Sequence, residues 1–265
     1  MTDFPLAEGK RWPRFPIDKH SPRFPFHGAP VGVMMLERGS NMPFLPGDTG
    51  NATTWSVPVR YKAVPGLTAS RILGPDAGEM TSAVVQAATE LVREGAQLIT
   101  CGCGYSIRYQ EAVRAAVDVP VFLSSLLLAP FLEMMLPPNK ALGIIVADKA
   151  VLTQDMLEAA GLRANIGRRV VIAGLEDTPV FARTFLRGGV DYLDVDAVET
   201  DVVNAAVALQ KDRPDIGILL LECGDLPPYA AAVQQATGGI PVFDYTSMVE
   251  FFVRGLIRKP FTGLI

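Results

Sequence analysis

Two Cys-Gly pairs, Cys103-Gly104 and Cys223-Gly224, occupy equivalent places in an internal repeat. Each pair is followed at closely matching spacings by a tyrosine, a valine, an apolar segment of the form β-Pro-β-Phe and two hydroxyl residues. These are Tyr109, Val113, residues 119–122 and Ser124-Ser125 in the first copy, and Tyr229, Val233, residues 240–243 and Thr246-Ser247 in the second. Agreement in so many features, in one order, indicates two similar halves.

A thiol in this setting can do acid–base chemistry. Each Cys-Gly pair falls at the carboxyl end of a predicted strand and just before a helix, which is where open parallel sheets bind ligands. A helix N-terminus favours thiolate, so we expect a lowered thiol pKa at Cys103 and Cys223. Inversion of a stereocentre needs a base on one face and an acid on the other, and two opposed thiols provide both.

Groups near the cysteines are candidates for binding an anionic substrate. Backbone N–H groups at the helix starts, with the hydroxyls of Ser124, Ser125, Thr246 and Ser247, suit a carboxylate and the enolate-like charge formed when its α-proton leaves. The loop of residues 38–51, which contains Asp48 and Asn51, also follows a predicted strand. Its polar residues serve either substrate binding or turn formation, and the sequence favours neither.

Other residues with reactive side chains are given structural roles. Cys101 corresponds to Leu221 in the second half, so we interpret it as a strand residue. Glu222 precedes Cys223, but neighbouring strand residues point to opposite faces, so contact with the thiol is not required. The two histidines lie in a Pro-rich segment far in sequence from the cysteines, and no metal site is expected.

Composition excludes several classes of function. The chain has 265 residues, of which 49% are hydrophobic and 20% charged, and its net charge is −4. This charge argues against nucleic-acid binding. The most apolar stretch, residues 121–136, is too short and interrupted to cross a bilayer, and no secretory signal is recognisable, so the prediction is a cytoplasmic protein without membrane association.

Strand-like and helix-like segments alternate along the chain, which predicts an α/β fold with parallel sheets. The expected strands are residues 31–36, 97–101, 119–123, 141–147, 170–174, 216–221 and 240–243, and the expected longer helices are 78–94 and 198–211. Residues 1–28 form a Pro-rich and aromatic arm. We expect a first domain of residues 29–128 plus 240–265 and a second of residues 129–239.

These motifs together resemble the aspartate/glutamate racemase superfamily, which includes pyridoxal-independent amino-acid racemases, hydantoin racemases, maleate isomerases and arylmalonate decarboxylases. The resemblance is carried by residues 46–51, Cys103-Gly104-Tyr105, residues 122–125, residues 221–229 and residues 241–244. It implies two Rossmann-like domains related by a pseudo-twofold axis around a cleft, no cofactor, and Cys103 and Cys223 as the acid/base pair. It further implies that the C-terminal segment returns to the first domain.

The residues that follow the two cysteines refine this resemblance. Glutamate racemases follow their cysteines with Asn-Thr and Thr-His, whereas Gly104-Tyr105 and Gly224-Asp225 stand here, which argues against glutamate as the substrate. The motifs are similar to those of the branch that includes algal dimethylsulfoniopropionate lyases, which also remove a proton α to a carboxylate. The expected substrate-binding residues are Asp48, Asn51, Gly104, Tyr105, Ser124, Ser125, Gly224 and Asp225.

The leading hypothesis is a cofactor-independent racemase or epimerase of an amino acid or a related small carboxylate. The alternatives are a lyase of the dimethylsulfoniopropionate type, a decarboxylase or isomerase of the same superfamily, and a binding protein that has lost turnover. A homo-oligomer, a dimer or larger, is expected.

Overall fold

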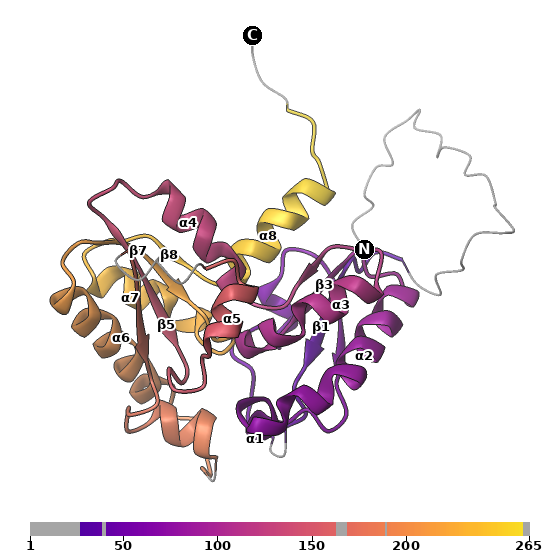
Figure 1. Ribbon diagram of the computed structural model, residues 1–265, viewed down its shortest axis with the longest axis horizontal. Helices are drawn as coiled ribbons and strands as arrows, with labels where there is room; N and C mark the ends of the chain where they lie inside the picture. The colour runs from indigo at the N-terminus through magenta and orange to yellow at the C-terminus, as the bar shows by residue number, and fades with distance from the viewer. Residues whose placement is uncertain (1–26, 39–40, 163–168, 189, 262–265) are drawn as a thin grey trace, which may run out of the picture.

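The computed structural model describes residues 27–38, 41–162, 169–188 and 190–261 (Figure 1). Two four-stranded sheets, in the orders β2-β1-β3-β4 and β6-β5-β7-β8, form two lobes, and every strand pair is parallel. The strands of the first sheet are Val31–Met35, Val59–Ala63, Leu98–Cys101 and Val121–Phe122 for β1 to β4. Those of the second are Ala141–Val146, Val170–Gly174, Ile216–Leu221 and Val242–Phe243 for β5 to β8. The identical strand order confirms the α/β fold and the internal repeat.

The central strands are continuous apolar runs because helices cover both of their faces. All residues of β3 and β5 are buried. Strand β2 was not predicted, because Arg60 and Lys62 alternate with apolar residues on a partly exposed edge. Its counterpart in the second half, β6, was predicted at its observed bounds.

The two predicted longer helices are α2 (Thr81–Arg93) and α6 (Val195–Asp212). Helix α2 buries Val84, Ala87, Ala88 and Leu91, the helical spacing that places one apolar stripe on the sheet. The first residues of the range predicted for α2 belong to a preceding 3-10 helix, Pro75–Met80. The shorter helices are Ala69–Leu73, Gln110–Ala116, Gln154–Ala159 and Ala230–Ala236 for α1, α3, α5 and α7.

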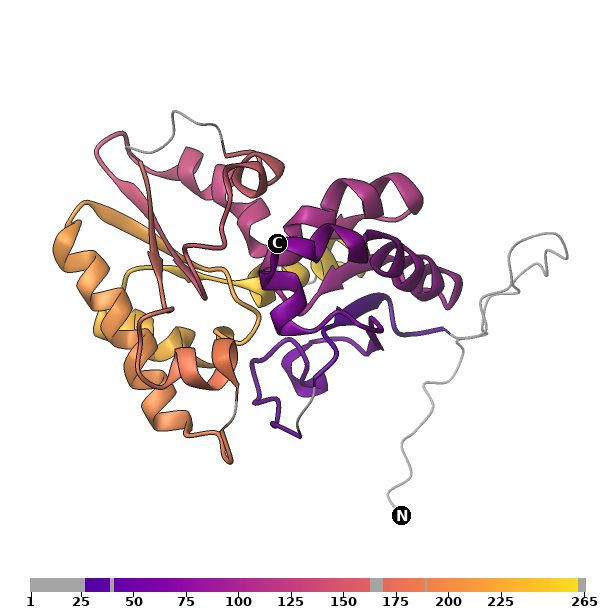
Figure 2. The same ribbon diagram turned by 60° about the horizontal axis from the view of Figure 1, so that its bottom comes forward.

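Two helices cross between the lobes. Helix α4 (Ala129–Met135) follows β4 of the first sheet and contacts β5 of the second. Helix α8 (Tyr245–Leu256) follows β8 of the second sheet, and its Val249 joins a core cluster with Val31 and Phe122 of the first. Figure 2 shows this yellow segment passing from one lobe to the other.

The expected start of the returning segment, residue 240, lies ahead of this crossing. Strand β8 pairs with β7, so residues 242–243 complete the second sheet. The part that packs on the first lobe begins with α8 at Tyr245, just as the part that packs on the second begins with α4 at Ala129.

The predicted N-terminal arm, residues 1–28, lies outside the described residues except for His27 and Gly28. Within the described ranges, no helix combines the length and apolar character needed to cross a membrane.

Candidate active site

Both repeated cysteines lie at the carboxyl ends of central strands and line one cavity between the lobes. Cys103 follows β3 through Gly102 and precedes a 3-10 helix, Gly104–Tyr109. Cys223 follows β7 through Glu222. The cavity has a volume of about 480 Å³ and is also lined by the start of α1 and by residues 184–188 of the second lobe. Two thiols from equivalent loops therefore face one shared space.

The two cysteine loops pack against each other through glycine. A methyl group on Gly104 would overlap the carboxyl group of Glu222, and one on Gly224 would overlap the carbonyl oxygen of Gly102. The residue after each cysteine thus lies against the residue before the other. This close approach holds the thiols at the junction of the lobes.

The expected lowering of the thiol pKa is wrong for this structure. Burial raises the pKa of Cys103 well above its ordinary value, and the nearby carboxyl group of Glu222 raises it further. Burial, then Asp225 and Glu222, raise the pKa of Cys223 in the same way. The backbone N–H groups of Tyr105 and Asp225 lower the two thiol pKa values, but burial is the larger effect and outweighs them.

One arginine and two aspartic acids form a connected group at the wall of the cavity. Arg38, which follows β1, pairs with Asp225 at 2.7 Å between Nη2 and Oδ1. The Cys223 Sγ donates to Oδ2 of Asp225 at 3.8 Å. Asp48 lies behind this pair, 5% exposed, and shares a hydrogen bond with Asp225.

Asp48 keeps its proton at neutral pH. Burial and the negative charge of Asp225 raise its pKa to about 8, against the opposing effects of the Gly50 N–H and Arg38. A protonated carboxyl group can donate to the Asp225 carboxylate, so Asp48 serves as a hydrogen-bond donor behind the cavity wall.

Glu222 is a buried carboxyl group for which the sequence indicated no functional role. It is 0% exposed, and neither carboxyl oxygen has a hydrogen-bond partner within the part of the chain that the structure describes. Burial raises its pKa to about 8, although the nearby Ala147 N–H acts in the opposite direction. The sequence did contain a signal for a functional role of Glu222. It is a single acidic residue directly after the six uncharged residues of β7, and the equivalent position in the first half of the repeat is Gly102.

Most of the expected substrate-binding side chains are used elsewhere. The Tyr105 hydroxyl donates to the Asp148 carbonyl at 2.6 Å and accepts from its N–H at 2.7 Å, and Ser125 donates to the Leu221 carbonyl at 2.9 Å, so both join the two lobes. Ser124 caps the following 3-10 helix, and Asn51 caps another while its amide donates to Phe44.

Of the eight expected residues, the structure places Asp225 in the cavity wall. Asp48 lies behind Asp225, and Gly104 and Gly224 allow the two cysteine loops to pack against each other. The cavity wall contains two charged residues that sequence reasoning missed, Glu37 and Arg187, and it contains Arg38 from the loop of residues 38–51, for which the sequence left substrate binding open. Cys101 is buried in β3 and accepts a hydrogen bond from Ser106, in agreement with its interpretation as a strand residue.

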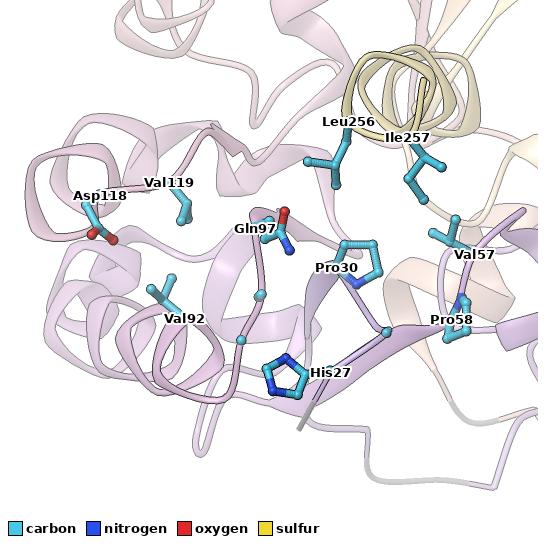
Figure 3. A pocket seen from close by; sticks show the side chains of 13 residues that line it. His27, Pro30, Val57, Pro58, Val92, Gln97, Asp118, Val119, Leu256 and Ile257 are labelled. Carbon is cyan, nitrogen blue, oxygen red and sulfur yellow. The ribbon is translucent and has the colours of Figure 1, made fainter. Parts of the chain in front are cut away.

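A second cavity, of about 500 Å³, lies at the opposite end of the first sheet, where its strands begin (Figure 3). Its polar side chains, His27, Gln97 and Asp118, come from separate segments and stand among aliphatic residues (Figure 3). Ligands of open α/β sheets bind at the carboxyl ends of strands, so the cavity with the two thiols is the candidate active site.

No protein-family profile matches the chain. It is 30% identical over 244 residues to a dimethylsulfoniopropionate lyase of Durusdinium sp. clade D, an alignment that covers 89% of the chain and 78% of that protein. It is 29% identical over 244 residues to dimethylsulfoniopropionate lyase 7 of Emiliania huxleyi, covering 88% and 69%.

Solved structures with the same fold include a glutamate racemase of Bacillus anthracis, with a TM-score of 0.58, 14% identity and coverage of 87% of the chain and 82% of that structure. An allantoin racemase of Pseudomonas fluorescens gives a TM-score of 0.52, 17% identity and coverage of 86% and 91%. A cysteine variant of arylmalonate decarboxylase gives a TM-score of 0.52 and 19% identity, and the match covers 86% of the chain and 92% of that structure. At these identities, the likeness establishes the fold.

Proposed function

Because the chain belongs to the aspartate/glutamate racemase superfamily, in the branch of the dimethylsulfoniopropionate lyases, we propose that it is a lyase that removes the α-proton of a small carboxylate. Dimethylsulfoniopropionate is the first candidate substrate. The sequence motifs favoured a racemase; the names and coverage of the sequence relatives shift the proposal to elimination.

The observation that carries the proposal is the placement of Cys103 and Cys223 on one cavity beside Arg38 and Asp225. A cysteine of this wall can act as the base, and Arg38 can pair with the carboxylate of the substrate. Asp225 places a negative charge near the sulfonium group of dimethylsulfoniopropionate. A site set between two lobes also limits the access of water, which strengthens electrostatic interactions with charge that develops at the α-carbon.

Cys223 is the proposed base, because its sulfur contacts a carboxylate. Its Sγ–H donates to Asp225, which can take the thiol proton and leave a thiolate. The thiolate removes the proton from C2 of the substrate. The C–H electron pair forms the C2–C3 double bond, the C3–S bond breaks, and its electron pair leaves with sulfur. The products are acrylate, neutral dimethyl sulfide and a proton held by the enzyme, which must return to solvent.

Racemisation is the second candidate, and the opposed position of Cys103 favours it. Cys103 is partly exposed to the same cavity from the other lobe, so it can return a proton to the opposite face of a carbanion. Elimination does not need this second proton transfer.

Proton NMR in heavy water tests the proposal. The purified protein is incubated with dimethylsulfoniopropionate, and separately with amino acids, hydantoins and malonates. We expect the vinyl signals of acrylate and the methyl signal of dimethyl sulfide. Loss of an α-proton signal from an intact amino acid or hydantoin, with chiral analysis showing inversion, would establish the racemase instead. No change in any compound would contradict both candidates.

A further inference from the structure

The ion pair between Arg38 and Asp225 joins the two lobes across the wall of the cavity. Arg38 follows β1 in the first lobe, and Asp225 follows Cys223 in the second. Their side chains are 23% and 18% exposed, and both line the cavity with the two thiols. A molecule that enters the cavity therefore meets this pair next to Cys223.

Arg38 uses few of its donors in this pair. Only Nη2 bonds to Asp225, whereas Nη1 is buried and has no hydrogen-bond partner among the described residues. The guanidinium lies over the Phe44 ring, with Cζ 3.7 Å from the ring centroid, which orients its plane. A guanidinium has a fork of donors that matches both oxygens of a carboxylate, so a second carboxylate can satisfy Arg38 better than Asp225 does.

The other candidates for a carboxylate anchor are engaged in structural contacts. The side chains of Tyr105 and Ser125 bond across the lobes, and those of Ser124 and Asn51 cap helices. Arg187 is the other cation among the described lining residues, and its Nη2 donates to the Glu176 carbonyl at 3.0 Å.

We propose that Arg38 binds the carboxylate of the substrate, exchanging Asp225 for it, and so makes the site selective for carboxylates over neutral compounds. This inference rests on the proposed function, which supplies the substrate class. The exchange leaves the Asp225 carboxylate without its cationic partner while it still faces the Cys223 sulfur. Substrate binding thereby frees the group that takes the thiol proton.

Ligand protection of the cavity thiols tests this proposal without turnover. Modification of Cys103 and Cys223 by a small thiol reagent is followed by mass spectrometry at increasing concentrations of propionate or of neutral propionamide. We expect propionate to protect both cysteines in the wild type. In Arg38→Gln, we expect the half-protecting concentration of propionate to rise on the order of 10- to 100-fold, because a charge-assisted hydrogen bond is lost. The half-protecting concentration of propionamide should be unchanged.

Three further variants sharpen the result. Arg38→Lys keeps the positive charge but lacks the forked donors of a guanidinium. Its half-protecting concentration of propionate should therefore fall between those of the wild type and Arg38→Gln. Arg213→Gln breaks another arginine–aspartate pair of 2.7 Å that is not part of the cavity wall, and it behaves as the wild type. Arg187→Gln tests the other cation, and here too the half-protecting propionate concentration remains close to the wild-type value.

Three outcomes overturn the proposal. Propionate does not protect the wild type, the half-protecting concentration of propionate is unchanged in Arg38→Gln, or this concentration rises more in Arg187→Gln than in Arg38→Gln. Unchanged propionamide protection shows that a variant is folded. If propionate protection depends on Arg38 but dimethylsulfoniopropionate is not cleaved, the anchor stands and the lyase proposal fails. If dimethylsulfoniopropionate is cleaved but protection does not depend on Arg38, the lyase proposal stands and the anchor fails.

Discussion

Cys103 and Cys223 occupy equivalent positions of the repeat but have different neighbours. Cys223 donates to the Asp225 carboxylate, while the backbone N–H of Tyr105 approaches Cys103. The pKa of both thiols is raised by burial and by Glu222, so neither is a free thiolate at neutral pH. A nearby proton acceptor therefore decides which sulfur acts as base, and Cys223 has one.

Glu222 should make the stability of the protein depend on pH. Its pKa is raised from an ordinary 4.5 to about 8, so the folded protein holds this proton at pH values where the unfolded chain has lost it. The folded state binds more protons between these values, and the free energy of unfolding falls as pH rises from about 5 to about 8. Asp48 acts in the same direction, because its pKa is raised from 3.8 to about 8.

Glu222→Gln removes one of these protons, so we expect the fall in unfolding free energy to become shallower by up to about 1.4 kcal/mol per pH unit. Gln resembles the protonated carboxyl group, so the variant gains stability relative to the wild type as pH approaches 8. Urea unfolding from pH 5 to 8 measures this effect, with the exposed Glu79→Gln as the control. Identical pH dependence in Glu222→Gln and the wild type would exclude a raised pKa for Glu222.

At the scale of elements, the contact between the two cysteine loops depends on glycine. Gly104→Ala places a methyl group where the Glu222 carboxyl group lies, so we expect a loss of stability of about 1–3 kcal/mol. Gly255→Ala is the matched control, because its methyl group meets open space in α8 and a helical Ala is favoured over Gly.

Chemical denaturation of Gly104→Ala, with and without Glu222→Ala, measures the contact. The loss should shrink when Glu222 is truncated, since the overlap with its carboxyl group is removed, and it should not vanish, since the Glu222 carbonyl oxygen remains close to the added methyl group. If Gly104→Ala is as stable as Gly255→Ala, the loops do not pack as the structure has them.

The sequence predicted most elements but few of the side chains around the cavity. Repetition predicted the cysteine loops, and apolar runs marked the buried strands. Strand β2 escaped because Arg60 and Lys62 interrupt its apolar residues on a partly exposed edge. Ser125 was expected to bind the substrate through its hydroxyl, yet it bonds to Leu221 of the other lobe. Arg38 lay in a loop that was noted for its polar residues, but sequence does not show which of them turns toward the thiols.

At the scale of the whole molecule, the crossing helices α4 and α8 and several hydrogen bonds join the lobes around the cavity. Tyr245 donates to the Leu123 carbonyl at 2.8 Å and so holds the crossing helix α8 on the first lobe. Between the lobes, Tyr105 bonds to Asp148, and the Thr49 N–H donates to the Gly224 carbonyl at 3.3 Å. The cavity geometry is thus a property of the joined lobes. The homo-oligomer remains a prediction, and exposed apolar side chains on α4 and α8, such as Phe131, Met134, Met135 and Phe251, indicate where to examine it.

The most direct test of cysteine-dependent proton removal is the NMR assay in heavy water with three variants, using the compound that the wild type converts. We expect Cys223→Ser to lose C–H cleavage by about 10²- to 10⁴-fold, the usual contribution of a general base, and buried Cys101→Ala to retain it. Cys103→Ser loses inversion but retains elimination, because elimination needs one base. Full activity of Cys223→Ser, or equal losses in Cys101→Ala and Cys223→Ser when both are folded, would contradict the account.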